Sequence, residues 1–267
     1  MNGSKPLLLD IYQSGEPCEA ARPYVVMIHG GGFTQGRKDQ APLPSYAAFL
    51  ANRGYVAVSI NYRLEGEEPA PSTEFVPFRD GLLAASNAAN SPQLERRANT
   101  IASAIQDVAN AIRYLEANGS AHCIDNSRMA LWGGSAGAFL GIAVAYALDD
   151  YDVTLTKPRA VINHWGGLVE TGVMVSSDAP IFIVHGDADP TVLYSKALEL
   201  QREAEASSVP YAFYTITGAG HGFDEIPVTT LTVDGTALQE LAAQFLDAHL
   251  FGQAPLYETR TVPITGS

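Results

Sequence analysis

The chain has 267 residues, of which 46% are hydrophobic and 17% are charged, so it suits one large domain or two small ones with a sizeable core. Its 29 acidic and 16 basic residues give a net charge of -13, which argues against binding to nucleic acid or to an anionic membrane surface. No apolar run reaches the roughly 18 residues of a transmembrane helix, and the first residues lack a signal-peptide pattern. The sequence therefore predicts a soluble protein, cytoplasmic as given, or secreted or periplasmic if a leader was removed upstream.

Short β-branched or aliphatic runs alternate with longer segments of helical periodicity, which indicates an α/β layered sheet. The inner runs are almost continuously apolar, as expected for strands that helices cover on both faces. In chain order, strands are predicted at 6–12, 24–29, 55–61, 129–132, 160–163, 180–185 and 211–216, and helices at 45–52, 101–118, 136–148, 192–207 and 236–250. We therefore predict a doubly wound, mostly parallel sheet.

One long connection, residues 65–99, interrupts this alternation between a predicted strand and a long helix. It contains several prolines and the pair Phe75 and Phe78, and a connection of this length is usually functional or mobile. No linker or repeat divides the chain, so we interpret residues 1–267 as one domain with one excursion that shapes specificity. Phe75 and Phe78 would line a substrate pocket or anchor the excursion to the core.

The first motif that could carry chemistry is His29-Gly30-Gly31-Gly32-Phe33, directly after a predicted strand. Three consecutive glycines indicate a loop, and they leave backbone N–H groups open to a close substrate. The stretch lacks both G-x-G-x-x-G and a following Gly-Lys-Ser/Thr, so it is not a phosphate-binding loop of either kind. It is either a tight structural turn or a loop whose backbone contacts a substrate.

A second motif, Gly133-Gly134-Ser135-Ala136-Gly137, lies between a predicted strand and an apolar helix. The strained turn that exposes a nucleophilic serine needs small neighbours, and here all four are Gly or Ala. A serine at a helix amino-terminus also lies where the helix dipole favours a developing negative charge. The alternative is an ordinary N-cap serine.

A serine nucleophile needs a base and a group that orients the base. Downstream, one predicted strand runs into His185-Gly186-Asp187-Ala188-Asp189, and the next runs into Gly218-Ala219-Gly220-His221-Gly222-Phe223. The acid and the histidine thus follow the carboxyl ends of strands, where ligands bind in open α/β sheets. The order serine, aspartate, histidine is the chain order of the α/β-hydrolase triad.

These motifs resemble those of α/β-hydrolase carboxylesterases, close to the hormone-sensitive-lipase-like and small acyl-carbohydrate or feruloyl esterases. The similarity extends from about residue 7 to residue 250 and includes the segments 9–12, 29–33, 58–64, 133–137, 185–189 and 220–223. The resemblance implies that Ser135 is the nucleophile, His221 the base and Asp189, rather than Asp187, the triad acid.

The resemblance also implies an oxyanion hole formed by the N–H groups of Gly31, Gly32 and Ala136. Because the glycine loop begins at residue 29, we expect the domain to lack the amino-terminal helical cap of hormone-sensitive-lipase-like enzymes. Gly134 also stands where that family usually has an acidic residue. Both differences favour the small uncapped esterases. Relatives often begin with one more strand, which leaves room for native sequence upstream of Met1.

The remaining histidines and cysteines suggest no metal, because neither His-Glu-x-x-His nor Cys-x-x-Cys occurs. Cys18 and Cys123 are interpreted as ordinary buried residues, with one disulfide as the alternative. His29 is expected to support the glycine loop. Candidates for the wall of a substrate pocket are Phe33, His164 and Trp165, with core packing as the alternative.

We therefore predict a serine carboxylesterase that acts through an acyl-enzyme on small ester substrates: short-acyl, acylated-carbohydrate or feruloyl-type esters. No cofactor, nucleic acid or membrane partner is expected, and the oligomeric state stays open. One alternative is a prolyl-oligopeptidase-like serine peptidase, whose serine motif is similar but which usually carries an amino-terminal propeller. The second alternative is a non-catalytic binding protein with the hydrolase fold. Such proteins typically replace the serine or the histidine, and this chain has both.

Overall fold

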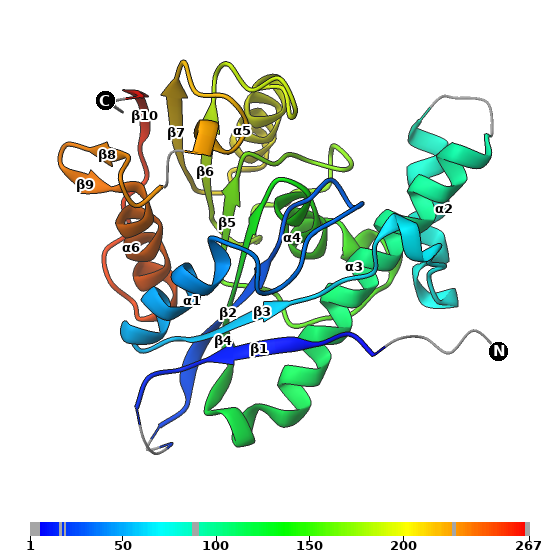
Figure 1. Cartoon of the computed structure of the whole chain (residues 1–267), viewed down its shortest axis with the longest axis horizontal. Coiled ribbons are helices and arrows are strands. Elements are labelled where there is room, and N and C mark those ends of the chain that lie inside the picture. Colours follow the sequence, from blue (N-terminus) through cyan, green and yellow to red (C-terminus); the bar gives the residue numbers. More distant parts are fainter. Residues whose placement is uncertain (1–5, 16–17, 19, 87–90, 226–227, 265–267) are drawn as a thin grey trace.

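An eight-stranded sheet forms the centre of the computed structural model, which describes residues 6–15, 18, 20–86, 91–225 and 228–264 (Figure 1). Within these ranges the strand order is β1-β3-β2-β4-β5-β6-β7-β10. The strands are β1 (Leu9–Tyr12), β2 (Arg22–Ile28), β3 (Val56–Ile60), β4 (Ile124–Gly134), β5 (Ala160–His164), β6 (Ile181–Gly186), β7 (Tyr211–Thr217) and β10 (Thr259–Pro263). All neighbouring strands pair in parallel except β1 and β3, which are antiparallel.

Helices cover both faces of this sheet. They are α1 (Leu43–Asn52), α2 (Val76–Ala85), α3 (Pro92–Asn118), α4 (Ala136–Tyr146), α5 (Ser195–Ser207) and α6 (Leu238–Leu250), with the short hairpin β8 (Thr232–Val233) and β9 (Thr236–Ala237) before α6. Short 3₁₀ helices are η1 (Glu65–Glu67), η2 (Thr73–Phe75), η3 (Gly119–His122), η4 (Leu148–Tyr151) and η5 (His221–Glu225). No helix in the described part of the chain is long and apolar enough to cross a membrane.

Successive residues of β2 enter two different cores, because side chains along a strand alternate between its faces. Val25 and Met27 pack in the core that α1 and α6 close, whereas Val26 and Ile28 pack in the core that α3 and α4 close. Figure 1 shows α1 and α6 on one side of the sheet and α3 on the other. The continuously apolar strands of the sequence are therefore explained by burial on both faces.

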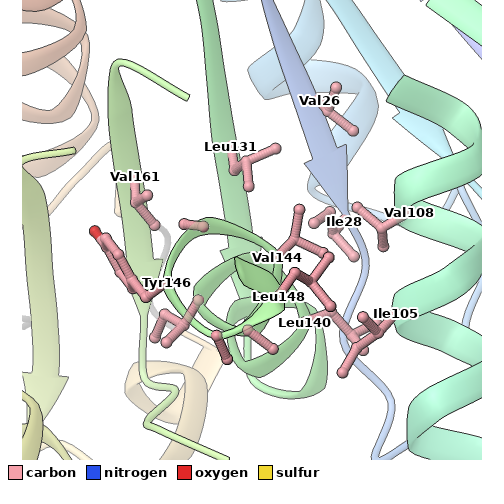
Figure 2. Close-up of a cluster of buried hydrophobic side chains, with 14 of the residues drawn as sticks. Val26, Ile28, Ile105, Val108, Leu131, Leu140, Val144, Tyr146, Leu148 and Val161 are labelled. Carbon is pink, nitrogen blue, oxygen red and sulfur yellow. The ribbon is translucent and has the colours of Figure 1, made fainter. Parts of the chain in front are cut away.

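The apolar helix α4 fills the centre of the second core. Figure 2 shows its Leu140 and Val144 close to Ile28 of β2, with Ile105 and Val108 of α3 on the adjoining side. All of these side chains except Val144 are at most 1% exposed. This packing fixes the start of α4 against the end of β2, which matters for the site described below.

The seven predicted strands and five predicted helices all occur, so the doubly wound, mostly parallel sheet is confirmed. Most ends lie within a few residues of the prediction. The exceptions are β4, which begins earlier at Ile124, and α3, which begins at Pro92. The sequence did not predict α2, β10 or the hairpin β8–β9.

The excursion at 65–99 is partly helical, because it contains α2 and the first turns of α3. The Ser91 hydroxyl caps α3 by accepting the Leu94 N–H at 3.2 Å. Phe75 and Phe78 are both fully buried among the side chains of the α3/α4 core. The prediction that they line a pocket is therefore wrong, and the anchoring alternative matches their placement.

Cys18 and Cys123 form a disulfide that joins the segment before β2 to the start of β4. The Arg22 N–H donates to the Cys123 carbonyl at 2.7 Å beside it. The alternative of one disulfide, which the sequence left open, is therefore the one that the structure has.

Candidate active site

Ser135 occupies the turn between β4 and α4. Its backbone has φ 53° and ψ −125°, a conformation that a residue with a side chain adopts only under strain. Its N–H donates to the carbonyl of His164 on β5 at 2.9 Å, which holds the turn in place. A sharp strained turn of this kind exposes a serine hydroxyl above the sheet at the start of a helix.

The hydroxyl of Ser135 meets His221, which follows β7 in the chain. The distance from Ser135 Oγ to His221 Nε2 is 3.0 Å, and His221 Nδ1 lies 2.7 Å from Asp189 Oδ2 in the loop after β6. All three residues lie beyond the carboxyl ends of parallel strands, where open α/β sheets bind ligands. The structure thus brings together the three residues that the sequence motifs named.

Asp189 is held rigidly and its side chain is fully buried. Its Oδ1 accepts the N–H groups of Thr191 at 2.8 Å and Val192 at 2.9 Å, so Oδ2 faces His221, with His185 Nε2 also 3.3 Å from it. The buried His185 donates through Nε2 to the Val192 carbonyl at 2.8 Å and fixes the same turn. Burial lowers the pKa of His185, which keeps this imidazole neutral next to the carboxylate.

Asp187, the other acid of this turn, has a different role. Its side chain is exposed, and its carboxylate accepts the Gly218 N–H at 2.6 Å. It therefore braces the loops after β6 and β7 against each other and leaves His221 to Asp189.

The glycine loop after β2 is supported from below by His29 and Tyr62. Their rings stack at 4.1 Å, the His29 Nδ1–H donates to the Gly30 carbonyl at 2.7 Å, and the Tyr62 hydroxyl donates to the His29 carbonyl at 3.0 Å. Burial lowers the pKa of His29, so the ring stays neutral. This geometry agrees with the predicted supporting role of His29.

Gly31 and Gly32 turn the loop toward Ser135. Both have positive φ, 111° and 63°, and the Gly31 carbonyl accepts the N–H groups of Thr34 and Gln35 at 3.1 Å. Ala136 is the first residue of α4, so its N–H has no carbonyl one turn earlier to bind. Gly31 and Gly32 line the same pocket as Ser135.

A residue that sequence reasoning missed, Arg97 of α3, clamps this loop from outside. Its guanidinium donates to the Gly32 carbonyl at 2.9 Å and lies 4.6 Å from the ring centre of Phe33. Phe33 is buried, packs against Tyr62 and does not line the pocket, so its predicted place in the pocket wall is wrong. No motif around Arg97 signals this contact, because it joins residues 65 positions apart.

The pocket at Ser135 has a volume of about 460 Å³. Predicted wall residues His164 and Trp165 do line it, and so do Tyr46 of α1 and Trp132 of β4, which the sequence did not single out. Phe75 and Phe78 do not. No group of His, Cys, Asp and Glu side chains that could hold a metal ion occurs among the residues the structure describes.

The turn at Ser135 depends on small residues for steric reasons. A Cβ atom at Gly137 would overlap the backbone carbonyl oxygen of Ile28 on β2, and neither backbone can move without shifting the core around α4. At Gly141, one turn further along α4, a Cβ atom would meet only side-chain carbons at 3.6 and 3.7 Å, an ordinary contact distance.

We therefore expect Gly137→Ala to lower the free energy of unfolding by about 3 kcal/mol. The matched change Gly141→Ala is expected to leave it unchanged or raise it by up to about 1 kcal/mol, because alanine is the better helix former. Urea unfolding of both variants measures the difference. Equal stability of the two variants would contradict the tight approach of α4 to β2.

This strand–turn–helix arrangement on a mostly parallel sheet places the protein in the α/β-hydrolase fold class. Within that class the chain belongs to the BD-FAE family, whose model matches residues 9–75 and 93–163, slightly more than half of the chain. The resemblance that the motifs indicated is thereby confirmed.

Individual relatives agree with this placement. The chain is 26% identical to Esterase LipQ of Mycobacterium tuberculosis, over 91% of this chain and 60% of that protein, so it spans about 60% of that relative's length. Apo esterase 2 of Thermogutta terrifontis superposes with a TM-score of 0.69 at 21% identity, covering 95% of this chain and 93% of that one. A truncated carbohydrate esterase from gut microbiota gives 0.66 at 20% identity, covering 91% and 90%. These two structures establish the shared fold.

Proposed function

We propose that the protein is a serine carboxylesterase that cleaves esters through a covalent acyl-enzyme at Ser135. One observation carries the proposal: the hydrogen-bonded line from Ser135 Oγ through the imidazole of His221 to the buried carboxylate of Asp189. Ser135, whose backbone is strained, lines a pocket of about 460 Å³, a volume typical of small-molecule binding sites. The similar proteins described above, each named as an esterase, also support the proposal.

In the first half of the proposed reaction, Ser135 Oγ attacks the ester carbonyl carbon while His221 Nε2 takes the hydroxyl proton. Asp189 accepts the Nδ1–H of His221, which holds the imidazole in the tautomer whose Nε2 is free and stabilises the imidazolium. The negative carbonyl oxygen would be held by the N–H groups of Gly31, Gly32 and Ala136. Each such donor contributes about 3 kcal/mol in comparable sites.

Collapse of this intermediate breaks the bond to the leaving alkoxide, which receives the proton from His221 Nε2 and departs as the alcohol. Water then enters, gives its proton to the same nitrogen and attacks the acyl carbon. Release of the acid returns the proton to Ser135 Oγ, so the cycle consumes one ester and one water and needs no further reactant.

The substrate class that we propose is a small ester: a short-acyl, acylated-carbohydrate or feruloyl-type ester. The pocket of about 460 Å³ suits a small group, and the part of its lining that the structure describes includes neither Asp, Glu, Lys nor Arg. A neutral apolar acyl chain would therefore lose less solvation there than a charged one.

A burst experiment tests the function. Mixing the protein with excess p-nitrophenyl acetate is expected to release p-nitrophenol rapidly in an amount equal to the protein, followed by slower steady turnover. Mass spectrometry of the quenched protein should place an acetyl group on the peptide that contains Ser135. A Gly-Pro p-nitroanilide serves as the amide control. Faster cleavage of the anilide than of the ester would replace the esterase proposal with the peptidase alternative.

A further inference from the structure

Two polar side chains in the pocket wall have no hydrogen-bond partner in the described part of the chain. Neither the imidazole of His164 nor the hydroxyl of Tyr46 forms a hydrogen bond there, although both residues line the pocket with Ser135. The two residues are only 2% and 5% exposed, and what they expose opens into this pocket, because neither has an unpaired polar atom that is sealed from solvent. A ligand that fills the pocket would displace water from these polar atoms, and leaving a desolvated polar group unpaired is costly.

Aromatic rings enclose these two groups. The His164 ring lies 5.3 Å from Trp132, 5.2 Å from Trp165 and 6.4 Å from Tyr46, measured between ring centres. Burial lowers the pKa of His164 to about 3 and raises that of Tyr46. Both groups are therefore neutral at physiological pH, and each offers one hydrogen-bond donor and one acceptor.

We propose that His164 and Tyr46 form a subsite that binds a neutral hydroxyl group on the acyl part of the substrate. A hydroxyl both donates and accepts, so it can pair with one group of each side chain, whereas a methyl group in its place would leave both unpaired. Among the described residues that line the pocket there is no Lys or Arg for a carboxylate and no Asp or Glu for an ammonium group. The inference rests on the proposed esterase function.

The acyl part is assigned to this subsite by the position of the base. The leaving oxygen must lie next to His221 Nε2, from which it takes its proton. The ring of Trp165 contacts both histidines, 6.4 Å from His221 and 5.2 Å from His164, whereas the two imidazoles make no ring contact with each other among the described residues. We therefore assign the group that contacts His164 and Tyr46 to the acyl part, which does not need to reach His221 Nε2.

The kinetic test compares ethyl esters whose acyl chains end in a hydroxyl or in a methyl group, over several chain lengths. For at least one length, the wild-type protein is expected to have a higher kcat/KM for the hydroxyl ester. Tyr46→Phe should lower this hydroxyl-to-methyl ratio about tenfold, as should His164→Leu, because each removes one partner. The matched control is Tyr24→Phe, since Tyr24 is buried elsewhere and its hydroxyl has no partner among the described residues.

A ratio that stays unchanged in both subsite variants would overturn the proposal. So would a hydroxyl preference that depends on Tyr46 but is found on the alcohol side of the ester. Each ratio is taken within a single variant, so a general loss of activity does not affect it.

A binding measurement separates this proposal from the esterase proposal. Trp132 and Trp165 are the two tryptophans of the chain, and both line the pocket, so their fluorescence reports its occupancy. In a Ser135→Ala background, ethyl ω-hydroxyhexanoate should bind more tightly than ethyl heptanoate, and Tyr46→Phe should remove the difference. If the wild type cleaves no ester but this difference persists, only the proposed function fails. If esters are cleaved and no difference is seen, only the subsite fails.

Discussion

Replacing Ser135 with alanine is expected to lower kcat for ester hydrolysis about a million-fold, the scale seen when the nucleophile of a serine hydrolase is removed. The substitution deletes the oxygen that lies 3.0 Å from His221 Nε2 and leaves the imidazole without a proton donor to activate. It keeps the small side chain that the strained turn requires, so the fold should persist. Residual catalysis of about 10³ to 10⁴ over water would come from the oxyanion hole and substrate positioning.

The measurement is steady-state hydrolysis of p-nitrophenyl acetate with circular dichroism of the same samples. Ser120→Ala is the matched control, because Ser120 is exposed in η3 before the amino end of β4, away from the carboxyl edge of the sheet. Wild-type turnover by the folded Ser135→Ala protein would remove Ser135 as nucleophile.

The order of the site along the chain could be predicted because each part follows from local rules. Residue 137 must be glycine because a side chain there would overlap the Ile28 carbonyl. The glycine of the motif around Ser135 is therefore required by the packing of α4 against β2. His221 and Asp189 each follow an apolar strand, and parallel strands deliver such residues to one edge. Local sequence thus carried both the type and the approximate position of Ser135, Asp189 and His221.

The walls of the pocket could not be predicted in the same way. Tyr46 lies on the buried face of α1 and Trp132 within β4, where large apolar side chains normally mean core. Only the placement of α1 against the end of the sheet opens these two residues to the pocket. Phe75 and Phe78 show the opposite error. Aromatic side chains occur both in pockets and in cores, and here the packing against α3 and α4 buries both in the core.

The sequence did not predict α2 or β10, and in each case the local residues explain why. Helix α2 contains Pro77 and Gly81, which read as loop signals, but proline is tolerated in the first turn of a helix and Gly81 lies close to Tyr151. Strand β10 is a half-exposed edge strand of mostly polar residues, so its sequence lacks the apolar run of the inner strands. Its pairing with β7 is a long-range contact that no local pattern records.

Replacing Asp189 with asparagine is expected to lower kcat about ten thousand-fold, although the side-chain shape is almost unchanged. The N–H groups of Thr191 and Val192 donate to Oδ1, so they would hold the amide oxygen of the asparagine at that position. The amide nitrogen would then take the place of Oδ2, 2.7 Å from His221 Nδ1. Because that nitrogen is a donor, His221 would have to keep its proton on Nε2 and could no longer accept the proton of Ser135.

Asp187→Asn is the matched control for this effect. It makes the same chemical change two residues earlier in the same turn, at an exposed carboxylate that accepts the Gly218 N–H. An asparagine oxygen can still accept that hydrogen bond, so we expect kcat to stay within a few-fold of the wild type. A large loss in Asp187→Asn together with a small one in Asp189→Asn would exchange the roles of the two acids. Because Asp189→Asn keeps the shape of the buried side chain, a large loss there without unfolding would reflect the tautomer of His221 and not the packing of the turn.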